Sequence, residues 1–244
     1  MKKERLDVLL VEKGLAETRT RAQALILAGQ VVVDDQRVDK PGTRVPIEVP
    51  IRLKGEGLKF VSRGGLKLEA ALEHFHVDVT GAVCADIGAS TGGFTDCLLQ
   101  RGAARVHAID VGYGQLHEKL RTDARVRSRE RVNARHLTDD DLPEPVSIIV
   151  IDVSFISLAL VLPGVLPKLA PKGTLVALVK PQFEVGPDQI EKGGVVRDTA
   201  ARAGAIDRIR AFVEAQGLAV DGVIDSPTPG PAGNVEALLV ARRP

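Results

Sequence analysis

In the first 60 residues of this 244-residue chain, the apolar positions form short segments, some typical of helices and some typical of strands. Leucines at residues 6–10 share one helical face, which ends near Gly14, a residue type common at helix termini. A second helical segment follows Thr18 and Thr20, either of which can cap it, and ends near Gly29. Valines at 31–33 before two aspartates predict a hairpin, and residues 51–53 predict a further strand. The first 60 residues are therefore expected to form a small α+β domain.

From Val79 onward the apolar pattern changes to strand-length runs separated by helix-like segments. The runs are residues 82–87, 105–111, 148–153, 174–179, 220–224 and 235–241. The helical segments include residues 94–100, 158–169 and 199–214. Strands that alternate with helices predict a parallel sheet covered on both faces. The loop at 226–234 leaves no room for a helix, so the last strand is expected to pair antiparallel with the strand before it.

The composition, 44% hydrophobic and 27% charged, is typical of a soluble globular protein. The longest uncharged stretch has 15 residues, whereas a membrane span needs about 20. The first ten residues lack the apolar segment of a signal peptide. Two cysteines, Cys84 and Cys97, are too few for a disulfide framework. These features predict a cytoplasmic protein with no membrane partner.

The net charge of +1 divides unevenly along the chain. Residues 1–65 hold 13 Lys and Arg against 9 Asp and Glu, a balance of +4, and the remainder has a balance of −3. A basic module on a mildly acidic body favours a polyanionic partner, although such an imbalance also arises by chance. A second basic stretch, residues 125–131, either contacts RNA or forms a solvated connection before the third run; we favour the connection.

A glycine-rich segment follows the first strand of the body and leads into a helix. Its glycines allow the backbone to approach a ligand at the carboxyl edge of the sheet. Asp110 follows 22 residues after Gly88, where a carboxylate can accept both hydroxyls of a ribose. Ser90 replaces the second glycine of a dinucleotide fingerprint, and Asp86 would repel a pyrophosphate but attract a cation. S-adenosylmethionine is thus expected in preference to a nicotinamide cofactor or a purely structural turn.

Four ionisable residues are predicted to converge on the same edge of the sheet. Asp152 and Lys180 end apolar strands, Glu236 begins the last strand, and Lys67 lies on a helix just before the body. A charge at the end of an apolar strand is costly to desolvate unless it is paired, although any one of them can be a solvated strand end. Methyl transfer to a hydroxyl needs a base, and a lysine serves where burial or a neighbouring cation favours its neutral form. We assign Lys180 as the base and Asp152 as the residue that orients it.

The motifs, taken in order, resemble the TlyA (hemolysin A) family of ribosomal RNA methyltransferases. They are Arg5-Leu6-Asp7, Thr18-Arg19-Thr20-Arg21-Ala22, Ser62-Arg63-Gly64-Gly65-Leu66-Lys67, the segments 86–95 and 110–115, Asp152-Val153-Ser154-Phe155, Lys180-Pro181-Gln182-Phe183-Glu184, the segment 192–198, and Gly233-Asn234-Val235-Glu236. The resemblance implies a Rossmann-like class I methyltransferase fold, α/β, with seven strands of which the last is antiparallel. It also implies an N-terminal S4 RNA-binding domain at residues 1–60, a linker at 61–65 and an FtsJ-like methyltransferase domain at 66–244.

For function, the resemblance implies S-adenosylmethionine-dependent 2′-O-methylation of a cytidine in ribosomal RNA. The implied catalytic tetrad is Lys67, Asp152, Lys180 and Glu236. The expected cofactor-binding residues are Asp86, Gly88, Ala89, Ser90, Thr91, Gly92, Gly93, Phe94, Asp110, Val111, Asn133 and Ala134. The expected RNA-binding residues are Arg5, Arg19, Arg21, Lys40 and Arg63, and base stacking is expected from Phe155 or Phe183.

Several alternatives stay open at this stage. The partner is expected to be ribosomal RNA or a ribosomal subunit, but a methyltransferase for another RNA or a non-enzymatic assembly factor would share these motifs. A pore-forming toxin would need membrane-active segments, which the sequence lacks. No metal is expected, because the histidines show no ligand spacing with the cysteines. Residues 185–198 form either a flap over the substrate or an ordinary loop.

Overall fold

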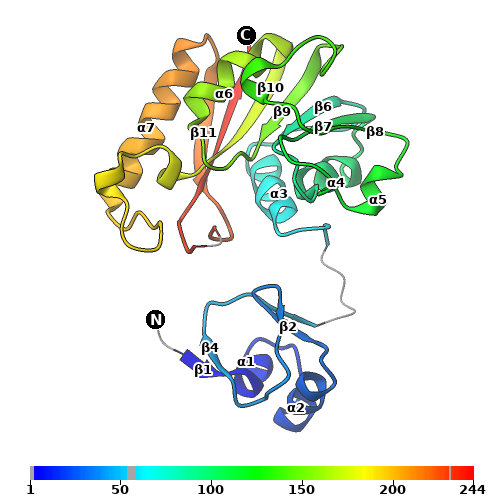
Figure 1. The fold of residues 1–244 in the computed structure, drawn as a ribbon, viewed down its shortest axis with the longest axis vertical. Coiled ribbons are helices and arrows are strands. Elements are labelled where there is room, and N and C mark those ends of the chain that lie inside the picture. Colours follow the sequence, from blue (N-terminus) through cyan, green and yellow to red (C-terminus); the bar gives the residue numbers. More distant parts are fainter. Residues whose placement is uncertain (1–2, 54–58, 231) are drawn as a thin grey trace. The chain divides into compact units, whose positions relative to one another are not determined.

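The computed structural model describes residues 3–53, 59–230 and 232–244. The chain divides into two compact units, residues 1–58 and 59–244 (Figure 1). This division falls two residues before the expected end of the N-terminal domain at residue 60, because Phe60 is buried in the core of the larger unit. The expected linker, residues 61–65, also lies in the larger unit, where helix α3 (Gly64–His74) begins.

The smaller unit contains two helices and short strands. Its elements are β1 (Lys3–Arg5), α1 (Leu6–Glu12), α2 (Arg19–Leu27), β2 (Val31–Val33), β3 (Gln36–Arg37), β4 (Arg44–Pro46) and β5 (Ile51–Leu53). Of the two candidate caps, Thr18 caps α2, since its hydroxyl accepts a hydrogen bond from Arg21 N at 3.2 Å. The predicted hairpin is confirmed: β2 pairs with β3 and also with β5, both antiparallel. The β1–β4 pair was not predicted, because three-residue strands carry no readable period.

The larger unit is built on one seven-stranded sheet, as expected from the family resemblance. Its strands are β6 (Val83–Ile87), β7 (Arg105–Ile109), β8 (Val126–Arg129), β9 (Val146–Ile151), β10 (Leu169–Val179), β11 (Ala219–Asp225) and β12 (Ala237–Arg242). They lie in the order β11-β12-β10-β9-β6-β7-β8. The last strand, β12, is antiparallel to both of its neighbours, β10 and β11. The predicted hairpin at the end of the chain is therefore confirmed, with β12 placed between two earlier strands.

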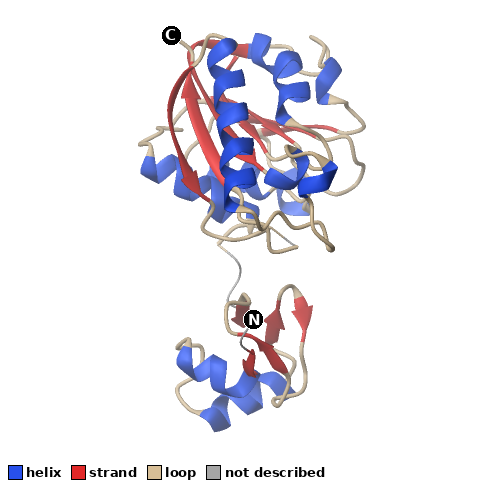
Figure 2. Ribbon diagram, turned by 90° about the vertical axis from the view of Figure 1, so that its left-hand side faces the viewer, coloured by secondary structure: helices blue, strands red, loops and turns tan. Residues whose placement is uncertain are grey.

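Helices cover both faces of this sheet (Figures 1 and 2). They are α3, α4 (Gly93–Gln100), α5 (Glu118–Arg121), α6 (Leu158–Val165) and α7 (Thr199–Ala215), with single 3-10 turns η1 (Ala134–His136), η2 (Leu166–Lys168), η3 (Pro181–Phe183) and η4 (Pro187–Gln189). Strand β9 shows the two-sided burial: Ile148 and Val150 pack in the core with α3 and α4, whereas Ile149 and Ile151 pack in the core with α6 and α7. Each face therefore has its own hydrophobic core.

The arginine-rich stretch is largely solvent-exposed, as expected, but the prediction that it is only a connection before the third strand was wrong. Residues 126–129 form the edge strand β8, which pairs parallel with β7. Only Val126 of this strand is buried, and the other three residues are exposed. An edge strand with one buried position has no apolar run, so the hydrophobic pattern could not distinguish it from a loop.

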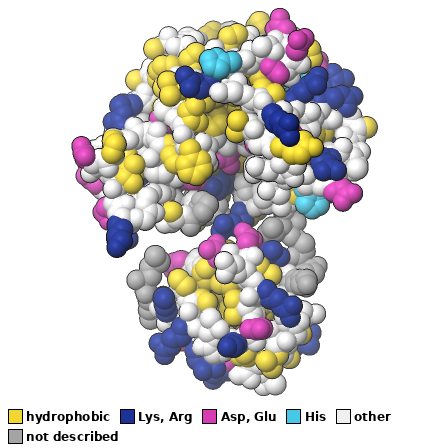
Figure 3. Space-filling model, viewed as in Figure 1, with side chains coloured by type: hydrophobic (Ala, Val, Ile, Leu, Met, Phe, Trp, Pro, Cys, Tyr) yellow, Lys and Arg dark blue, Asp and Glu magenta, His cyan; other side chains and the backbone are white. Residues whose placement is uncertain are grey.

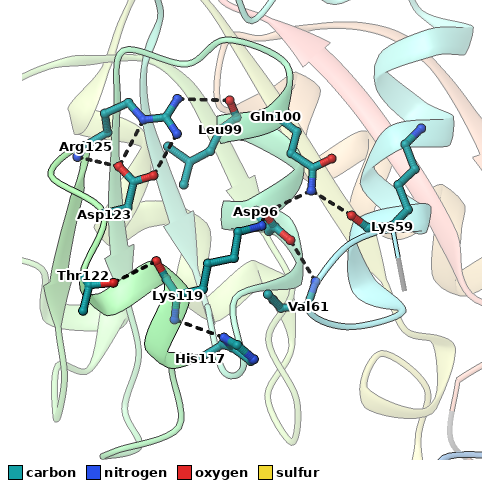
Figure 4. A network of polar contacts seen from close by, with 10 residues as sticks. All are labelled: Lys59, Val61, Asp96, Leu99, Gln100, His117, Lys119, Thr122, Asp123 and Arg125. Carbon is teal, nitrogen blue, oxygen red and sulfur yellow. Dashed lines mark hydrogen bonds and ion pairs between the residues drawn. The ribbon is translucent and has the colours of Figure 1, made fainter. Parts of the chain in front are cut away.

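A polar network holds the chain in front of α3 against α4 (Figure 4). The buried Asp96 accepts hydrogen bonds from Val61 N at 2.9 Å, from Gln100 Nε2 at 3.1 Å and from Lys119 Nζ at 3.2 Å. Gln100 Nε2 also donates to Lys59 O at 2.8 Å. Because these bonds fix the entry to α3, they also fix the position of the side chains on its first turn, including Lys67.

Candidate active site

Three of the four predicted catalytic residues lie at one edge of the sheet because of strand register. Asp152 follows the last residue of β9, and Lys180 follows the last residue of β10, its parallel neighbour. Strand β12 runs the opposite way, and its first residue, Ala237, pairs with Val179. Glu236 therefore precedes β12 at the same edge at which β10 ends. The topology thus brings together residues that are far apart in the sequence.

The four residues form two ion pairs. Lys67 Nζ lies 2.5 Å from Glu236 Oε2, and both side chains are buried, with exposed fractions of 9% and 1%. Lys180 Nζ lies 2.6 Å from Asp152 Oδ1 and donates a hydrogen bond to Ser154 Oγ at 2.8 Å. Pairing offsets the cost of removing these charges from water. Glu236 Oε1 and Asp152 Oδ1 are buried and accept no hydrogen bond from the described residues.

The glycine-rich loop after β6 approaches the end of β9 closely. Gly88 has φ of +83°, and a Cβ atom there would lie 2.5 Å from the carbonyl oxygen of Asp152. Only glycine fits both this conformation and this contact. The loop is therefore held directly beside the residues that pair at the sheet edge.

Asp86 lies beneath this loop and is fully buried. Its Oδ2 accepts a hydrogen bond from Thr95 Oγ1 at 2.6 Å, while its Oδ1 is buried without a hydrogen-bond partner in the described part of the chain. Burial raises the pKa of the Asp86 carboxyl to about 7, and the nearby charges of Asp152 and Asp110 act in the same direction. When it is ionised, a carboxyl group with an unsatisfied oxygen can attract a cationic ligand, so a role for Asp86 in binding S-adenosylmethionine stays a prediction.

Asp110, at the end of β7, is oriented by two backbone amides. Ser90 N donates to its Oδ2 at 2.8 Å, and Gly112 N donates to its Oδ1 at 2.6 Å. Each carboxylate oxygen keeps a second lone pair, so the group can still accept from a pair of ribose hydroxyls. A pocket beside it is lined by residues that include Ser90, Asp110, Gly112, Gln115, Ser128 and Glu130. The Asp110 carboxylate therefore keeps acceptors that the hydroxyl groups of a ligand can use.

Not every predicted cofactor residue lies in this pocket. Ala89 and Ser90 line it, but Phe94 is buried in the core against Gly64, and Asn133 and Ala134 do not line it. Asn133 instead caps η1, where its side chain accepts from Arg135 N. Gln115, Ser128 and Glu130 were not predicted as cofactor residues. Recognition of β8 would have drawn attention to Ser128 and Glu130, because they lie at the carboxyl end of that strand.

The loops after β9 and β10 are joined to each other by side-chain contacts. Glu184 accepts hydrogen bonds from Ser157 Oγ at 2.6 Å and from Leu158 N at 2.8 Å, at the start of α6. The rings of Phe155 and Phe183 lie 5.2 Å apart between centroids. Phe155 is 90% exposed and has φ of +64°, a conformation rarely adopted by residues with a large side chain. An exposed aromatic ring thus follows Ser154, whose hydroxyl accepts a hydrogen bond from Lys180.

Residues 185–198, expected to form either a flap or an ordinary loop, are bonded to the loop that carries Glu236. Within residues 185–198, Glu191 pairs with Val195 in an isolated antiparallel bridge. The buried side chain of Asn234 accepts from Val196 N at 2.9 Å and donates to Gly194 O at 2.8 Å. Asn234 lies two residues before Glu236, so the segment is connected to the loop that carries this carboxylate.

The predicted RNA-binding residues of the smaller unit have different surroundings. Arg5 and Arg19 both bond to Asp7, whose side chain is buried, with Nε to carboxylate distances of 2.9 Å. The hydrogen bond from Arg5 is the main reason that the pKa of the Asp7 carboxyl is held well below its usual range. Arg21 and Lys40 are exposed and form no ion pair among the described residues. Figure 3 shows several Lys and Arg side chains on the surface of this unit. Arg63, the fifth candidate, precedes α3 in the larger unit.

The described residues contain neither a candidate metal cluster nor a helix that could span a membrane. No group of three or more His, Cys, Asp or Glu side chains in residues 3–53, 59–230 and 232–244 is arranged to hold a metal ion. Among the helices of the same residues, none is long and apolar enough to cross a membrane.

Comparisons with known proteins agree with this architecture. The FtsJ-like methyltransferase family matches residues 60–243, and the S4 domain family matches residues 4–49. The chain is 46% identical to the 16S/23S rRNA (cytidine-2'-O)-methyltransferase TlyA of Mycobacterium tuberculosis over 99% of this chain and 90% of that protein. It is 41% identical to Hemolysin A of Brachyspira hyodysenteriae over 96% of this chain and 98% of that protein.

A solved structure, of a candidate hemolysin from Streptococcus thermophilus, is 47% identical and has a TM-score of 0.78 over 100% of this chain and 89% of that one. The family matches, the sequence identities and the shared fold all cover most of the chain. The chain therefore belongs to the TlyA (hemolysin A) family, in which an S4 domain is joined to an FtsJ-like methyltransferase domain.

Proposed function

We propose that this protein transfers a methyl group from S-adenosylmethionine to the 2′-hydroxyl of a cytidine in ribosomal RNA. The observation that carries the proposal is the double ion pair at the sheet edge, Lys67 with Glu236 and Lys180 with Asp152, beside a loop suited to a cationic nucleoside. The name of the relative from Mycobacterium tuberculosis supports ribosomal RNA and cytidine as the substrate. An S4 domain supports an RNA partner, and a ribosomal substrate would place the protein in the cytoplasm.

In this proposal the protein binds the cofactor by its two ends. Asp110 accepts the ribose hydroxyls, with Val111 beside it, and the unsatisfied oxygen of Asp86 attracts the positive charge of the amino acid end. The bound cofactor supplies an electrophilic methyl group. The protein supplies a fixed position for the acceptor hydroxyl, on which the rate of an in-line transfer largely depends.

Lys180 acts as the general base in this mechanism. Its amine takes the proton of the 2′-hydroxyl as the oxygen attacks the methyl group, and Asp152 holds the amine in place from 2.6 Å. The Lys67–Glu236 pair provides a second anchor, because Glu236 Oε1 is left to accept a hydrogen bond from the substrate. The exposed ring of Phe155 stacks on a base of the RNA in this proposal, and the ring of Phe183 contacts it within the protein.

The test is methyl transfer from labelled S-adenosylmethionine to intact ribosomal subunits, dissociated subunits and free ribosomal RNA. The wild-type protein is expected to label the 2′-oxygen of a cytidine, and Lys180→Ala is expected to lose at least a hundredfold in rate. If another RNA is labelled instead, the protein is a methyltransferase with a different RNA substrate. Binding to subunits without any label would support a non-enzymatic assembly factor and overturn the proposal.

A further inference from the structure

Lys180 Nζ contacts two oxygen atoms but donates a hydrogen bond to only one of them, Ser154 Oγ, which lies outside the proposed tetrad. Asp152 Oδ1 lies at 2.6 Å, and Ser154 Oγ lies at 2.8 Å. Ser154 is exposed, in the loop that follows β9. In the described part of the chain, the bond from Lys180 is the one hydrogen bond of the Ser154 side chain. Neither burial nor another hydrogen bond therefore explains a serine at this position.

The geometry of a neutral amine explains what the hydroxyl of Ser154 can do. A neutral amine has two N–H bonds and one lone pair in a tetrahedral arrangement. Asp152 Oδ1 lies close to the amine but accepts no hydrogen bond in the described part of the chain, so the bond to Ser154 is the one that fixes the direction of an N–H. With Asp152 alone, the amine would stay near the carboxylate but could turn, and its lone pair would point in many directions. A general base works only when its lone pair lies on the proton that it removes.

We propose that Ser154 is a positioning residue that, together with Asp152, directs the lone pair of Lys180 at the ribose 2′-hydroxyl. This inference rests on the proposed function, in which Lys180 is the base. In the step, the O2′–H bond breaks and the proton joins Nζ, which becomes an ammonium group. The O2′–carbon bond forms as the sulfur–methyl bond breaks, and its electron pair stays on sulfur as a neutral thioether. Ser154 exchanges no proton in this step.

The loop of Ser154 is held in the position that this role requires. Glu184 bonds to Ser157 Oγ and Leu158 N, and it lies four residues after Lys180 in the sequence. The ring of Phe155, next to Ser154, contacts the ring of Phe183. The loop that carries Ser154 and the loop that carries Lys180 are thus also joined by contacts among the residues that follow them in the sequence. The Ser154–Lys180 bond is therefore not the one contact that holds these two loops together.

Three variants test the inference by single-turnover methyl transfer to the RNA labelled by the wild type. Ser154→Ala is expected to lower kcat about tenfold, with unchanged dissociation constants for cofactor and RNA and an unchanged melting temperature. Ser154→Thr keeps the hydroxyl and should restore most of the rate. Ser147→Ala, at an exposed serine on β9, is the matched control and should react at the wild-type rate. A structural role alone would lower the melting temperature or binding instead of kcat.

The outcomes separate this inference from the proposed function. If Lys180→Ala loses activity while Ser154→Ala keeps the wild-type kcat, Lys180 remains the base and the role of Ser154 is overturned. If Lys180→Ala keeps its activity, the proposed base itself is wrong. Combining Ser154→Ala with Lys180→Ala should cost no more than Lys180→Ala alone, because Ser154 acts through that amine. Additive losses would contradict the inference.

Discussion

A Cβ atom added to Gly230 would lie 2.5 Å from Glu236 Oε1, closer than any real contact of this kind. The neighbouring atom is the end of a side chain, so Gly230→Ala is expected to displace the carboxylate and weaken its 2.5 Å pair with Lys67. We expect kcat to fall at least tenfold while the fold persists. The measurement is methyl transfer alongside thermal unfolding.

Gly204→Ala is the control for this change. Gly204 lies within α7, and a Cβ atom there meets only Arg208, at 3.5 Å. Its activity should be unchanged, and its stability should rise by about 1 kcal/mol, because alanine is the better helix former. Wild-type activity of Gly230→Ala would show that the position of the Glu236 carboxylate is not critical.

The buried Lys67–Glu236 pair should contribute to stability in a way that surface pairs do not. Lys67→Met leaves a buried carboxylate without its partner and is expected to reduce the free energy of unfolding by about 3–5 kcal/mol. Adding Glu236→Leu removes the unpaired charge, so stability should largely return while activity stays lost. Urea denaturation and methyl transfer measure the two effects separately.

Arg210→Met is the matched control, because Arg210 forms an exposed pair with Glu214 on α7. Removal of such a pair should change the free energy of unfolding by less than about 1 kcal/mol. A stability of Lys67→Met equal to that of the wild type would mean that the pair is not buried as described.

Asp86 predicts a pH dependence in both stability and ligand binding. Its pKa is raised from 3.8 to about 7 in the folded protein, so the folded state binds a proton that the unfolded state has lost between these values. The stability contributed by the protonated form is therefore complete below pH 3.8 and is lost as pH rises through 7. Asp86→Asn should unfold with a flatter pH profile over this range, as measured by urea denaturation.

Ionised Asp86 should attract a cation better than the neutral acid does. Affinity for S-adenosylmethionine is therefore expected to increase as pH rises through 7, and Asp86→Asn should bind weakly with little pH dependence. Calorimetric titration at several pH values measures this. If the affinity for S-adenosylmethionine increases with pH equally in the wild type and in Asp86→Asn, the titrating group is not Asp86.

The S4 domain should bind RNA through charges that are free to meet phosphate. Arg21→Glu and Lys40→Glu are expected to weaken RNA binding and each to reduce the magnitude of the salt slope by about 1, with no loss of stability. Arg5→Ala should lower both RNA affinity and stability, because it also removes the main partner of the buried Asp7. Filter binding at several salt concentrations measures RNA affinity, and thermal unfolding measures stability. Together they distinguish residues that only bind RNA from Arg5, which also stabilises the fold. Equal stability losses in all three variants would contradict this division.

The order of the helices and buried strands in the larger unit could be predicted from local sequence patterns. Apolar runs and helical segments gave the buried strands, and Asp110, Asp152 and Lys180 were placed at strand ends from their positions alone. The edge strand β8 was not readable, since one buried valine carries no period. For the same reason its pocket residues Ser128 and Glu130 were not predicted.

The sequence by itself determined which ionisable residues end strands, because apolar runs and breaks are local properties of the chain. Only the tertiary structure decided how they pair. The partner of Lys67 is Glu236, 169 residues away, and this choice depends on β12 entering between β10 and β11. The sequence does not distinguish Arg5 and Arg19 from Arg21. In the folded chain, Arg5 and Arg19 both pair with the buried Asp7. Burial and strand register are properties of the folded chain, and they set which charges meet each other and which meet a ligand.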